Sequence, residues 1–258
     1  MSNGIMLSVQ DRVAVISGGS RGIGAATVKM FVAAGAKVLF NYQQNRSAAD
    51  EVIGECGEER CAAVQADLRN IESSHALIEQ AVKRFGGVDI LVANHGIWPA
   101  EDVEVDRMTN RQWHDTVAIN LDSVFGLVKH AVGQMKKGGR GGHIVLVSST
   151  AGQRGEAFHC DYAATKGAVI SMVKGLSTEL ARDRIRVNCV APGWVDTDMA
   201  APALNDPVTR DQVFATIPLR RVGTPDEIAA PILFLCTEHA GFITGEVFNV
   251  NGGAVLVG

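Results

Sequence analysis

The sequence lacks the features that would place this protein in a membrane, outside the cell or on nucleic acid. It contains no apolar run long enough to span a bilayer, and no Arg- or Lys-led apolar segment at its start that resembles a signal peptide. Its 5 cysteines include no Cys-x-x-Cys pair, which favours a reducing compartment over a disulfide framework. With a net charge of −4 it has no basic surplus to attract nucleic acid or an acidic membrane. We therefore expect a cytoplasmic protein without nucleic-acid or membrane partners, and we assign no metal ligands.

What is present is the composition of one globular domain. The chain has 258 residues, of which 47% are hydrophobic and 20% are charged, enough to bury one large core. Apolar β-branched runs alternate with helical segments, and no repeat, linker or low-complexity stretch interrupts them. This alternation predicts a parallel sheet with helices on both faces. We expect a single α/β domain over residues 1–258, a doubly wound sheet of the Rossmann type.

The first strand-and-helix unit carries a glycine-rich loop. A buried-strand pattern over residues 12–17 runs into Gly18-Gly19-Ser20-Arg21-Gly22-Ile23-Gly24, and an Ala-rich helix follows to about Gly35. In this context glycines let the backbone approach a pyrophosphate, which the helix N-terminus then binds. The alternative is a tight turn that needs glycine only for a positive φ. The position in the first unit favours nucleotide binding.

The end of the second predicted strand, residues 37–42, bears on the choice of cofactor. An NAD site would place an acid there to hold the ribose 2′-hydroxyl, but Asn41 occupies that place. Arg21 in the loop and Arg46 beyond the strand offer guanidinium groups to a 2′-phosphate. We expect NADP, with NAD possible. The alternative is that both arginines are solvated surface charges.

Asp67 and Leu68 follow the third predicted strand, residues 61–66. Asp67 has two interpretations of equal weight. It either accepts a hydrogen bond from an adenine amino group or caps the helix predicted for residues 71–84.

The pair Tyr162 and Lys166 is the strongest catalytic candidate. Side chains four residues apart on a helix share a face. A free phenol titrates near about 10, and an adjacent ammonium lowers that pKa toward the range useful for proton transfer. Ser149, at the end of the fifth predicted strand (residues 143–149), could reach the same space. The alternatives are a packed tyrosine beside a surface lysine, and a serine that only satisfies loop backbone.

Asn120 lies within the apolar pattern of a long helix predicted for residues 111–137. A buried amide is costly unless it is hydrogen-bonded. We expect it to hold a backbone carbonyl or a water.

Together these motifs resemble the short-chain dehydrogenase/reductase family over nearly the whole chain. The family's Thr-Gly-x-x-x-Gly-x-Gly loop appears as residues 17–24, its Asn-Asn-Ala-Gly as residues 93–96 and its Pro-Gly-x-Val-x-Thr as residues 192–197. The family's active-site residues match Asn120, Ser149, Tyr162 and Lys166. Three residues depart from these motifs: serine replaces threonine at Ser17, Ala93 replaces the first asparagine of the fourth-strand motif, and His95 puts a bulky titratable ring where the family usually has a methyl group. His95 either packs against the cofactor or contributes to substrate binding.

The resemblance implies an NAD(P)-dependent oxidoreductase acting on CH–OH groups. Tyr162 would donate a proton to a substrate carbonyl oxygen that Ser149 orients. Lys166 would bond the nicotinamide ribose and lower the pKa of Tyr162, and Asn120 would hold a water that links Lys166 to solvent. The residues assigned to the cofactor are Gly18, Ser20, Arg21, Gly22, Ile23, Gly24, Asn41, Asp67, Leu68, Asn94, Gly96, Tyr162, Lys166, Pro192, Gly193, Val195 and Thr197.

Within the family the chain most resembles 3-oxoacyl-acyl-carrier-protein reductases and their sugar or alcohol dehydrogenase relatives. An acidic carrier protein requires a basic dock near the cleft, and the candidate basic groups are Lys136, Lys137 and Arg140, and Arg182, Arg184 and Arg186. Only Arg140 falls on a position that matches such reductases, and Asp183 stands where the second docking arginine is expected. A compact carbonyl substrate is the alternative, with a pocket lined by Trp98, Gln153, Phe158, His159 and Trp194.

Three further expectations accompany the resemblance. Residues 198–218 would form a substrate lid. The long helices near residues 111–137 and 171–182, with the last strand, would form the contacts of a homotetramer. A nucleotide-sensing scaffold without turnover is the non-enzymatic alternative, although such proteins typically lose the Tyr, Lys or Ser that this chain keeps.

Overall fold

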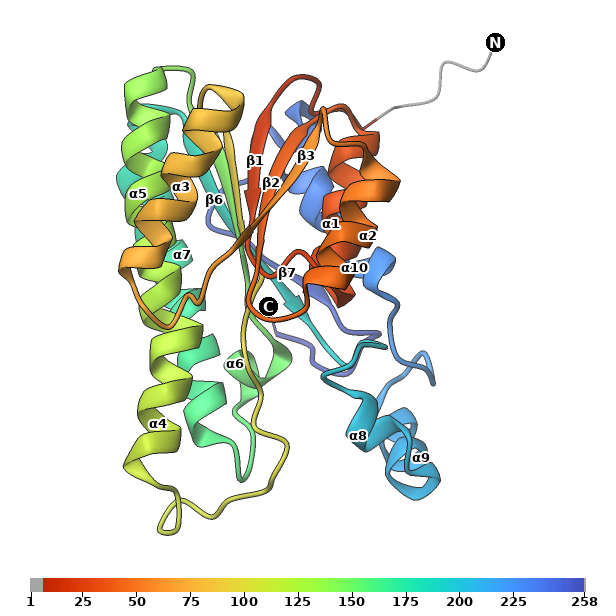
Figure 1. The fold of residues 1–258 in the computed structure, drawn as a ribbon. Helices are drawn as coiled ribbons and strands as arrows, with labels where there is room; N and C mark the ends of the chain where they lie inside the picture. The colour runs from red at the N-terminus through yellow and green to blue at the C-terminus, as the bar shows by residue number, and fades with distance from the viewer. Residues whose placement is uncertain (1–6, 258) are drawn as a thin grey trace.

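The strands of the chain lie side by side and parallel in one twisted sheet (Figure 1). The computed structural model describes residues 7–257, so residues 1–6 and 258 of the predicted domain lie outside it. Among the described residues the strand order is β3-β2-β1-β4-β5-β6-β7. The strands are β1 (Val13–Ile16), β2 (Lys37–Tyr42), β3 (Cys61–Gln65), β4 (Ile90–Ala93), β5 (Gly142–Val147), β6 (Ile185–Pro192) and β7 (Val247–Val250). The winding direction reverses between β1 and β4, where doubly wound sheets bind ligands.

Helices cover both faces of this sheet, as predicted. Figure 1 shows α3, α5 and α7 on one side and α1, α2 and α10 on the other. Their bounds are α1 (Gly22–Ala33), α2 (Arg46–Cys56), α3 (Glu72–Phe85), α5 (Ser123–Gly138), α7 (Cys160–Leu180) and α10 (Pro225–Leu235). No helix among residues 7–257 combines the length and apolar character needed to cross a bilayer.

Alternation along each central strand sends side chains into two separate cores. Ala14 and Ile16 of β1 pack in the cluster that contains Phe31 of α1. Val15, between them, packs in the opposite cluster with Leu77 of α3 and Leu127 of α5. Because a strand presents successive side chains to opposite faces, a strand buried on both faces must be apolar throughout. This explains the uninterrupted apolar runs and confirms the predicted fold class.

The long helix predicted for residues 111–137 is interrupted in its middle. It begins as α4 (Asn110–Val117), capped by the Thr109 hydroxyl, which accepts from the Gln112 amide at 3.1 Å. A π-turn, η1 (Ala118–Asp122), follows, and α5 continues the same path. Asn120 is fully buried within this turn. A π-turn adds a residue to one turn of helix and is common at functional sites.

Two segments contain short helices that the sequence pattern did not indicate. The first is α6 (Thr150–Arg154), which begins directly after Ser149. The second is the expected lid, where α8 (Ala201–Leu204) and α9 (Pro207–Thr216) replace a plain loop. Asp206 caps α9 by accepting from the Thr209 amide at 2.8 Å, and the proline after it suits the first helical position. In Figure 1, α8 and α9 project beyond the lower end of the sheet. Short 3₁₀ turns, η2 (Ala181–Asp183) and η3 (Glu238–Ala240), complete the described elements.

The amino edge of the sheet is held by the buried carboxylate of Asp89. It accepts from the Val13 amide at 2.9 Å and from Arg140 at 2.7 Å, and Arg12 lies 3.6 Å away. Lys136 likewise pairs with Asp183 at 2.9 Å. Arg140 and Lys136, two of the basic residues expected to form a dock near the cleft, therefore lie near the start of β5 and pair with acids of this chain. This placement corrects the expectation that they border the cleft.

Candidate active site

A cavity of about 350 Å³ lies at the carboxyl edge of the sheet, where β1, β2, β3, β4, β5 and β6 all end. It brings together most of the residues predicted from the sequence: Gly18, Ser20, Arg21, Gly22, Ile23, Asn41, Asp67, Leu68, Asn94, Gly96, Ser149, Tyr162, Lys166, Pro192, Gly193, Val195 and Thr197. Two predicted residues, Gly24 and Asn120, do not line it. Both lie directly behind its wall.

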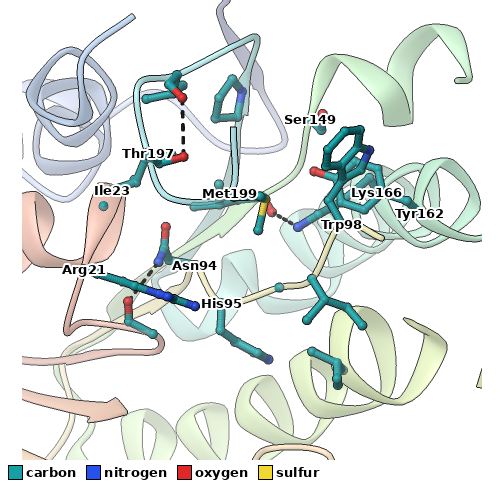
Figure 2. A pocket seen from close by; sticks show the side chains of 18 of the residues that line it. Arg21, Ile23, Asn94, His95, Trp98, Ser149, Tyr162, Lys166, Thr197 and Met199 are labelled. Carbon is teal, nitrogen blue, oxygen red and sulfur yellow. Dashed lines mark hydrogen bonds between the residues drawn. The ribbon is translucent and has the colours of Figure 1, made fainter. Parts of the chain in front are cut away.

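Three polar side chains gather on one side of this cavity (Figure 2). Ser149 is the N-cap of α6, and its hydroxyl oxygen accepts from the Ala151 amide at 3.1 Å. Tyr162 lies in the first turn of α7, and Lys166 follows one turn later. The Lys166 ammonium donates to the Val147 carbonyl at 2.9 Å and lies 5.7 Å from the centre of the Tyr162 ring. The predicted shared face of Tyr162 and Lys166 is therefore present.

Burial dominates the electrostatics of these groups. It raises the pKa of Tyr162 to about 12, although a hydrogen bond with Ser149 acts in the opposite direction. Burial also lowers the pKa of Lys166 to about 8. Both shifts have the same cause, because removing water penalises whichever form is charged. The net pKa of Tyr162 is therefore raised, and the expected lowering of it by Lys166 stays a prediction.

The Asn120 side chain forms hydrogen bonds with the backbone, which is one of the two alternatives, a backbone carbonyl or a water, that the sequence left open. Its side-chain oxygen accepts from the Ile97 amide at 2.8 Å, and its amide nitrogen donates to the Ile97 carbonyl at 2.9 Å. A Cβ atom on Gly96 would come within 3.2 Å of the Asn120 oxygen and 3.4 Å of the Lys166 nitrogen. Asn120 thus holds the strand-end loop against Lys166, and glycine is the residue that leaves room there.

The glycine loop has the shape of a cradle for a pyrophosphate. Gly18 and Gly22 adopt positive φ angles of 67° and 54°. A Cβ on Gly24 would fall 2.0 Å from the Gly18 carbonyl oxygen, so α1 can approach the end of β1 only through glycine. The first turn of α1 then presents unpaired N–H groups and the positive end of the helix dipole to the cavity. These residues fit the diphosphate of a dinucleotide.

Asparagine side chains hold this loop in place. The Asn41 oxygen accepts from the Gly18 amide at 2.9 Å, and its nitrogen donates to the Ala66 carbonyl at 3.1 Å. Asn94 donates to the Ser17 carbonyl at 3.2 Å. Asn41, which was assigned to the cofactor from the sequence, lines the cavity and also supports the glycine loop.

The positive charge available for a 2′-phosphate comes from Arg21 and Arg69, which both line the cavity. Arg21 is mostly exposed and lies 3.4 Å from Asp198. Arg46 does not line the cavity and pairs with Asp50 at 3.5 Å, which matches the surface-charge alternative. Arg69 was missed from the sequence because nothing in its neighbourhood distinguishes it from a surface arginine.

Asp67 borders the cavity instead of capping a helix. Its carboxylate accepts from the Arg69 amide at 3.0 Å within a turn. Helix α3 begins only at Glu72, and its N-cap residue, Ile71, has no side-chain cap. The capping alternative is wrong, and the carboxylate remains at the edge of the cavity beside the buried Leu68.

The other end of the cavity has an aromatic wall. The Trp98 ring stacks on His159 with centroids 4.8 Å apart, and the edge of Trp194 meets it at 6.0 Å. His159 is held by the Pro99 carbonyl at 2.8 Å. Of the five predicted pocket residues, only Trp98 and Trp194 line the cavity, and His159 supports them.

The lining residues that were not predicted from the sequence include Arg154 and Glu156, and the cavity also reaches Met199 of the expected lid. Burial raises the pKa of the Glu156 carboxyl. Arg154 and Glu156 flank the end of α6, a helix too short to be read from periodicity. Met199 opens the predicted lid, and Figure 2 shows it between the two sides of the cavity.

Comparisons with known proteins agree with this geometry. A family model described as enoyl-(acyl carrier protein) reductase matches residues 18–255. The chain is 38% identical to the 3-oxoacyl-[acyl-carrier-protein] reductase of Synechocystis sp., over 97% of this chain and 100% of that protein. It is also 38% identical to the 3-oxoacyl-[acyl-carrier-protein] reductase FabG of Vibrio cholerae, over the same two shares. A solved structure titled short-chain dehydrogenase/reductase, glucose/ribitol dehydrogenase, from Brucella melitensis superposes with a TM-score of 0.90 at 36% identity, covering 98% of this chain and 100% of its own.

Replacing Lys166 by methionine should stabilise the fold at neutral pH. Below pH 8 the ammonium is charged in both the folded and the unfolded chain, so folding bears the full cost of burying it. The gap between the ordinary pKa of 10.5 and about 8 corresponds to roughly 3 kcal/mol, and losing the hydrogen bond to Val147 offsets about 1 kcal/mol. We expect a net gain of about 2 kcal/mol in the free energy of unfolding at pH 7.

Denaturant unfolding at pH 7 and at pH 9.5 measures this gain. Between pH 8 and 10.5 the folded wild-type protein has released the proton while the unfolded chain retains it, so wild-type stability rises and the advantage of Lys166→Met shrinks. Lys174→Met, on the exposed face of the same helix, is the matched control and should show no such gain. A Lys166→Met variant less stable than wild type at pH 7 would contradict the burial argument.

Proposed function

Because this chain belongs to the short-chain dehydrogenase/reductase family, we propose that it uses NADPH to reduce the 3-oxo group of an acyl thioester on acyl carrier protein. It is an NAD(P)-dependent oxidoreductase that acts on carbonyl and CH–OH groups. The observation that carries the proposal is the meeting of Ser149, Tyr162 and Lys166 with the glycine loop in one cavity. Relatives named as 3-oxoacyl-[acyl-carrier-protein] reductases support the choice of substrate.

In the proposed site, different segments of the chain would bind the adenosine half and the nicotinamide half of the cofactor. The Gly18–Ile23 backbone would bind the diphosphate, and Asp67 with Leu68 would border the adenine. Asn94 and Gly96 would support the adenosine half, as the family resemblance implies. Lys166 would bond the nicotinamide ribose. At the end of β6 and just after it, Pro192 and Gly193 would border the cofactor, and Val195 and Thr197 would fix its carboxamide. When bound, the nicotinamide supplies the hydride.

Proton transfer is then the task of Tyr162 and Ser149. A pKa of about 12 keeps the Tyr162 phenol protonated at neutral pH, so it is poised to donate a proton to a substrate carbonyl oxygen. The Ser149 oxygen already accepts from Ala151, which leaves the hydroxyl hydrogen available to the same carbonyl oxygen. Approach of the Lys166 ammonium to the phenol stabilises the phenolate that donation leaves behind. Asn120, which is bonded to Ile97, serves as a positioning residue in this scheme.

Tyr162→Phe should remove turnover but retain the cofactor. The phenol contributes the acid–base step, whose loss costs about 10² to 10⁴ in rate. The ring that lines the cavity remains, so the Kd of NADPH should stay within about twofold. Steady-state NADPH oxidation and fluorescence titration measure the two quantities separately. Turnover above a tenth of the wild-type rate would show that another group donates the proton.

The same assay tests the substrate. The panel comprises acetoacetyl-acyl carrier protein, an acetoacetyl thioester, and free ketones and aldoses. A preference for the carrier-linked thioester supports the proposal, whereas turnover of free carbonyls alone favours a dehydrogenase of small alcohols, sugars or ketones. That second candidate rests on the compact aromatic wall and on the similarity to the Brucella melitensis structure. Cofactor binding without turnover of any member would favour a nucleotide-sensing scaffold.

NADPH should bind about tenfold more tightly than NADH, because a charge-assisted contact from Arg21 or Arg69 to the 2′-phosphate contributes about 1.5 kcal/mol or more. Arg21→Gln should narrow the ratio of the two Kd values. Arg46→Gln is the matched control, because Arg46 pairs with Asp50 outside the cavity. Equal affinities of the wild-type protein for NADPH and NADH would exclude a contact of Arg21 or Arg69 with the 2′-phosphate.

We also propose that residues 198–218 act as a lid over the substrate, since Asp198, Met199 and Ala200 line the cavity and α8 and α9 follow. Carbonyl substrates should protect this segment from hydrogen exchange when NADPH is present. Unchanged exchange across α8 and α9 would argue against a lid.

We further propose a cytoplasmic homotetramer. Trp113 of α4, Phe125 of α5, and Phe242, Phe248 and Leu256 near β7 leave large apolar side chains exposed on one copy of the chain. All 5 cysteines are free thiols, as suits a reducing compartment. Light scattering should report four times the mass of the 27.3 kDa chain, and a monomer would contradict the assembly.

A further inference from the structure

A short chain of hydrogen bonds runs from the end of β1 to the start of α5 through His95. The Ser17 hydroxyl lies 2.6 Å from Nδ1 of His95, and Nε2 of the same ring lies 2.6 Å from the Ser123 hydroxyl. The Ser123 hydroxyl in turn lies 2.6 Å from the Ile119 carbonyl. Ser17 and Ser123 are completely buried. This row of hydrogen bonds therefore lies beneath the cavity.

The partners define which ring nitrogen carries the proton. Ser123 has one hydroxyl hydrogen, and the Ile119 carbonyl, which can only accept, takes it. Nε2 of His95 must therefore donate to the Ser123 oxygen. The Ser17 oxygen accepts from the Asn94 amide at 3.0 Å, and its own hydrogen points to Nδ1 at 2.6 Å, since the Val92 carbonyl is 3.5 Å away. The ring is thus a neutral bridge that donates at one end and accepts at the other.

The surroundings keep this ring neutral. Burial lowers the pKa of His95 to about 4, and the charge of Lys166 acts in the same direction. A protonated ring would carry hydrogen on both nitrogens and would lose the hydrogen bond from Ser17. At neutral pH the bridge is complete.

The two ends of the bridge are parts of the cofactor site. Ser17 directly precedes the glycine loop, and a Cβ on Gly18 would lie 3.1 Å from the Cβ of His95. Ser123 directly follows the π-turn that contains Asn120. In Figure 2 the His95 ring points away from Tyr162 and toward the helix that follows. Both ring nitrogens are already paired, so the ring offers no free donor or acceptor to a substrate.

We propose that His95 is a positioning residue for the nicotinamide cofactor: its neutral ring joins the base of the glycine loop to the π-turn and so preorganises the cofactor site before binding. The inference rests on the cofactor of the proposed function and is independent of the substrate. Binding then costs less, because the loop and the π-turn are already held in their relative positions.

Three substitutions at His95 separate the two ends of the bridge. His95→Ala removes both hydrogen bonds. His95→Asn places an acceptor near the position of Nδ1 and can keep the bond to Ser17. His95→Gln places a donor near the position of Nε2 and can keep the bond to Ser123. The matched control is His143→Ala, because His143 is also a buried histidine with a lowered pKa, bonded to Arg186 at 2.9 Å at the opposite edge of the sheet.

Two measurements on the full chain report the result. Fluorescence titration gives the Kd of NADPH, and hydrogen exchange of the cofactor-free protein follows the Asn94 and His95 amides, which donate to the Ser17 oxygen at 3.0 and 3.3 Å. We expect His95→Ala to raise the Kd about tenfold, as the loss of two hydrogen bonds of ordinary strength implies, and to increase exchange at both amides. His95→Asn and His95→Gln should each recover part of the affinity. His143→Ala should lower the melting temperature and leave the Kd unchanged.

The outcomes separate this inference from the proposed function. If the wild-type protein binds NADPH normally and His95→Ala binds it with the same Kd, the inference is overturned but the proposed function is not. The same holds if the Kd of NADPH rises as much in His143→Ala as in His95→Ala. If His95→Ala does not fold, the Kd values of His95→Asn, His95→Gln and Ser123→Ala decide, and wild-type values in all three overturn the inference. A wild-type protein that binds neither NADPH nor NADH would overturn the proposed function together with it.

Discussion

The close approach of α1 to the end of β1 is the constraint on which the rest of the site depends. Gly24 lies so near the Gly18 carbonyl that a Cβ there would be 2.0 Å from its oxygen. Only this approach turns the start of α1 toward the switch point of the sheet, where the polarity of the helix favours a phosphate. The positions of Asn41, Asn94 and the segment after β6 follow from where that helix begins.

Buried amides and hydroxyls then hold the loops that the strands leave at the carboxyl edge. Asn41 bonds Gly18, Asn120 bonds Ile97, and the bridge through His95 joins the glycine loop to the π-turn. Loop backbone that is buried needs such partners, because unpaired N–H and C=O groups are costly away from water. The same bonds that satisfy the loops also restrict their movement, which is what a preorganised binding site requires.

Burial also decides the charge state of Tyr162 and Lys166. The same loss of water that raises the pKa of Tyr162 lowers that of Lys166, so the two pKa values, ordinarily close together, move apart to about 12 and about 8. A buried lysine is a cost to the fold, and here that cost lies beside Tyr162, the proton donor that we propose. Under that proposal the site gives up stability for reactivity.

The sequence by itself determined the sheet, the glycine loop and the shared face of Tyr162 and Lys166 on α7, because each depends on local periodicity or on spacing along one element. Val13–Ile16 is apolar throughout, and Tyr162 and Lys166 lie one turn apart. Only the tertiary structure decided which isolated polar residues meet. It turned Asn41 toward Gly18, brought Arg69 and Glu156 to the cavity, engaged Arg140 with Asp89 and placed His95 between two serines. The physical reason is that these contacts join segments far apart in the chain, and desolvation, which shifts the pKa values of His95 and Glu156, depends on everything packed around them.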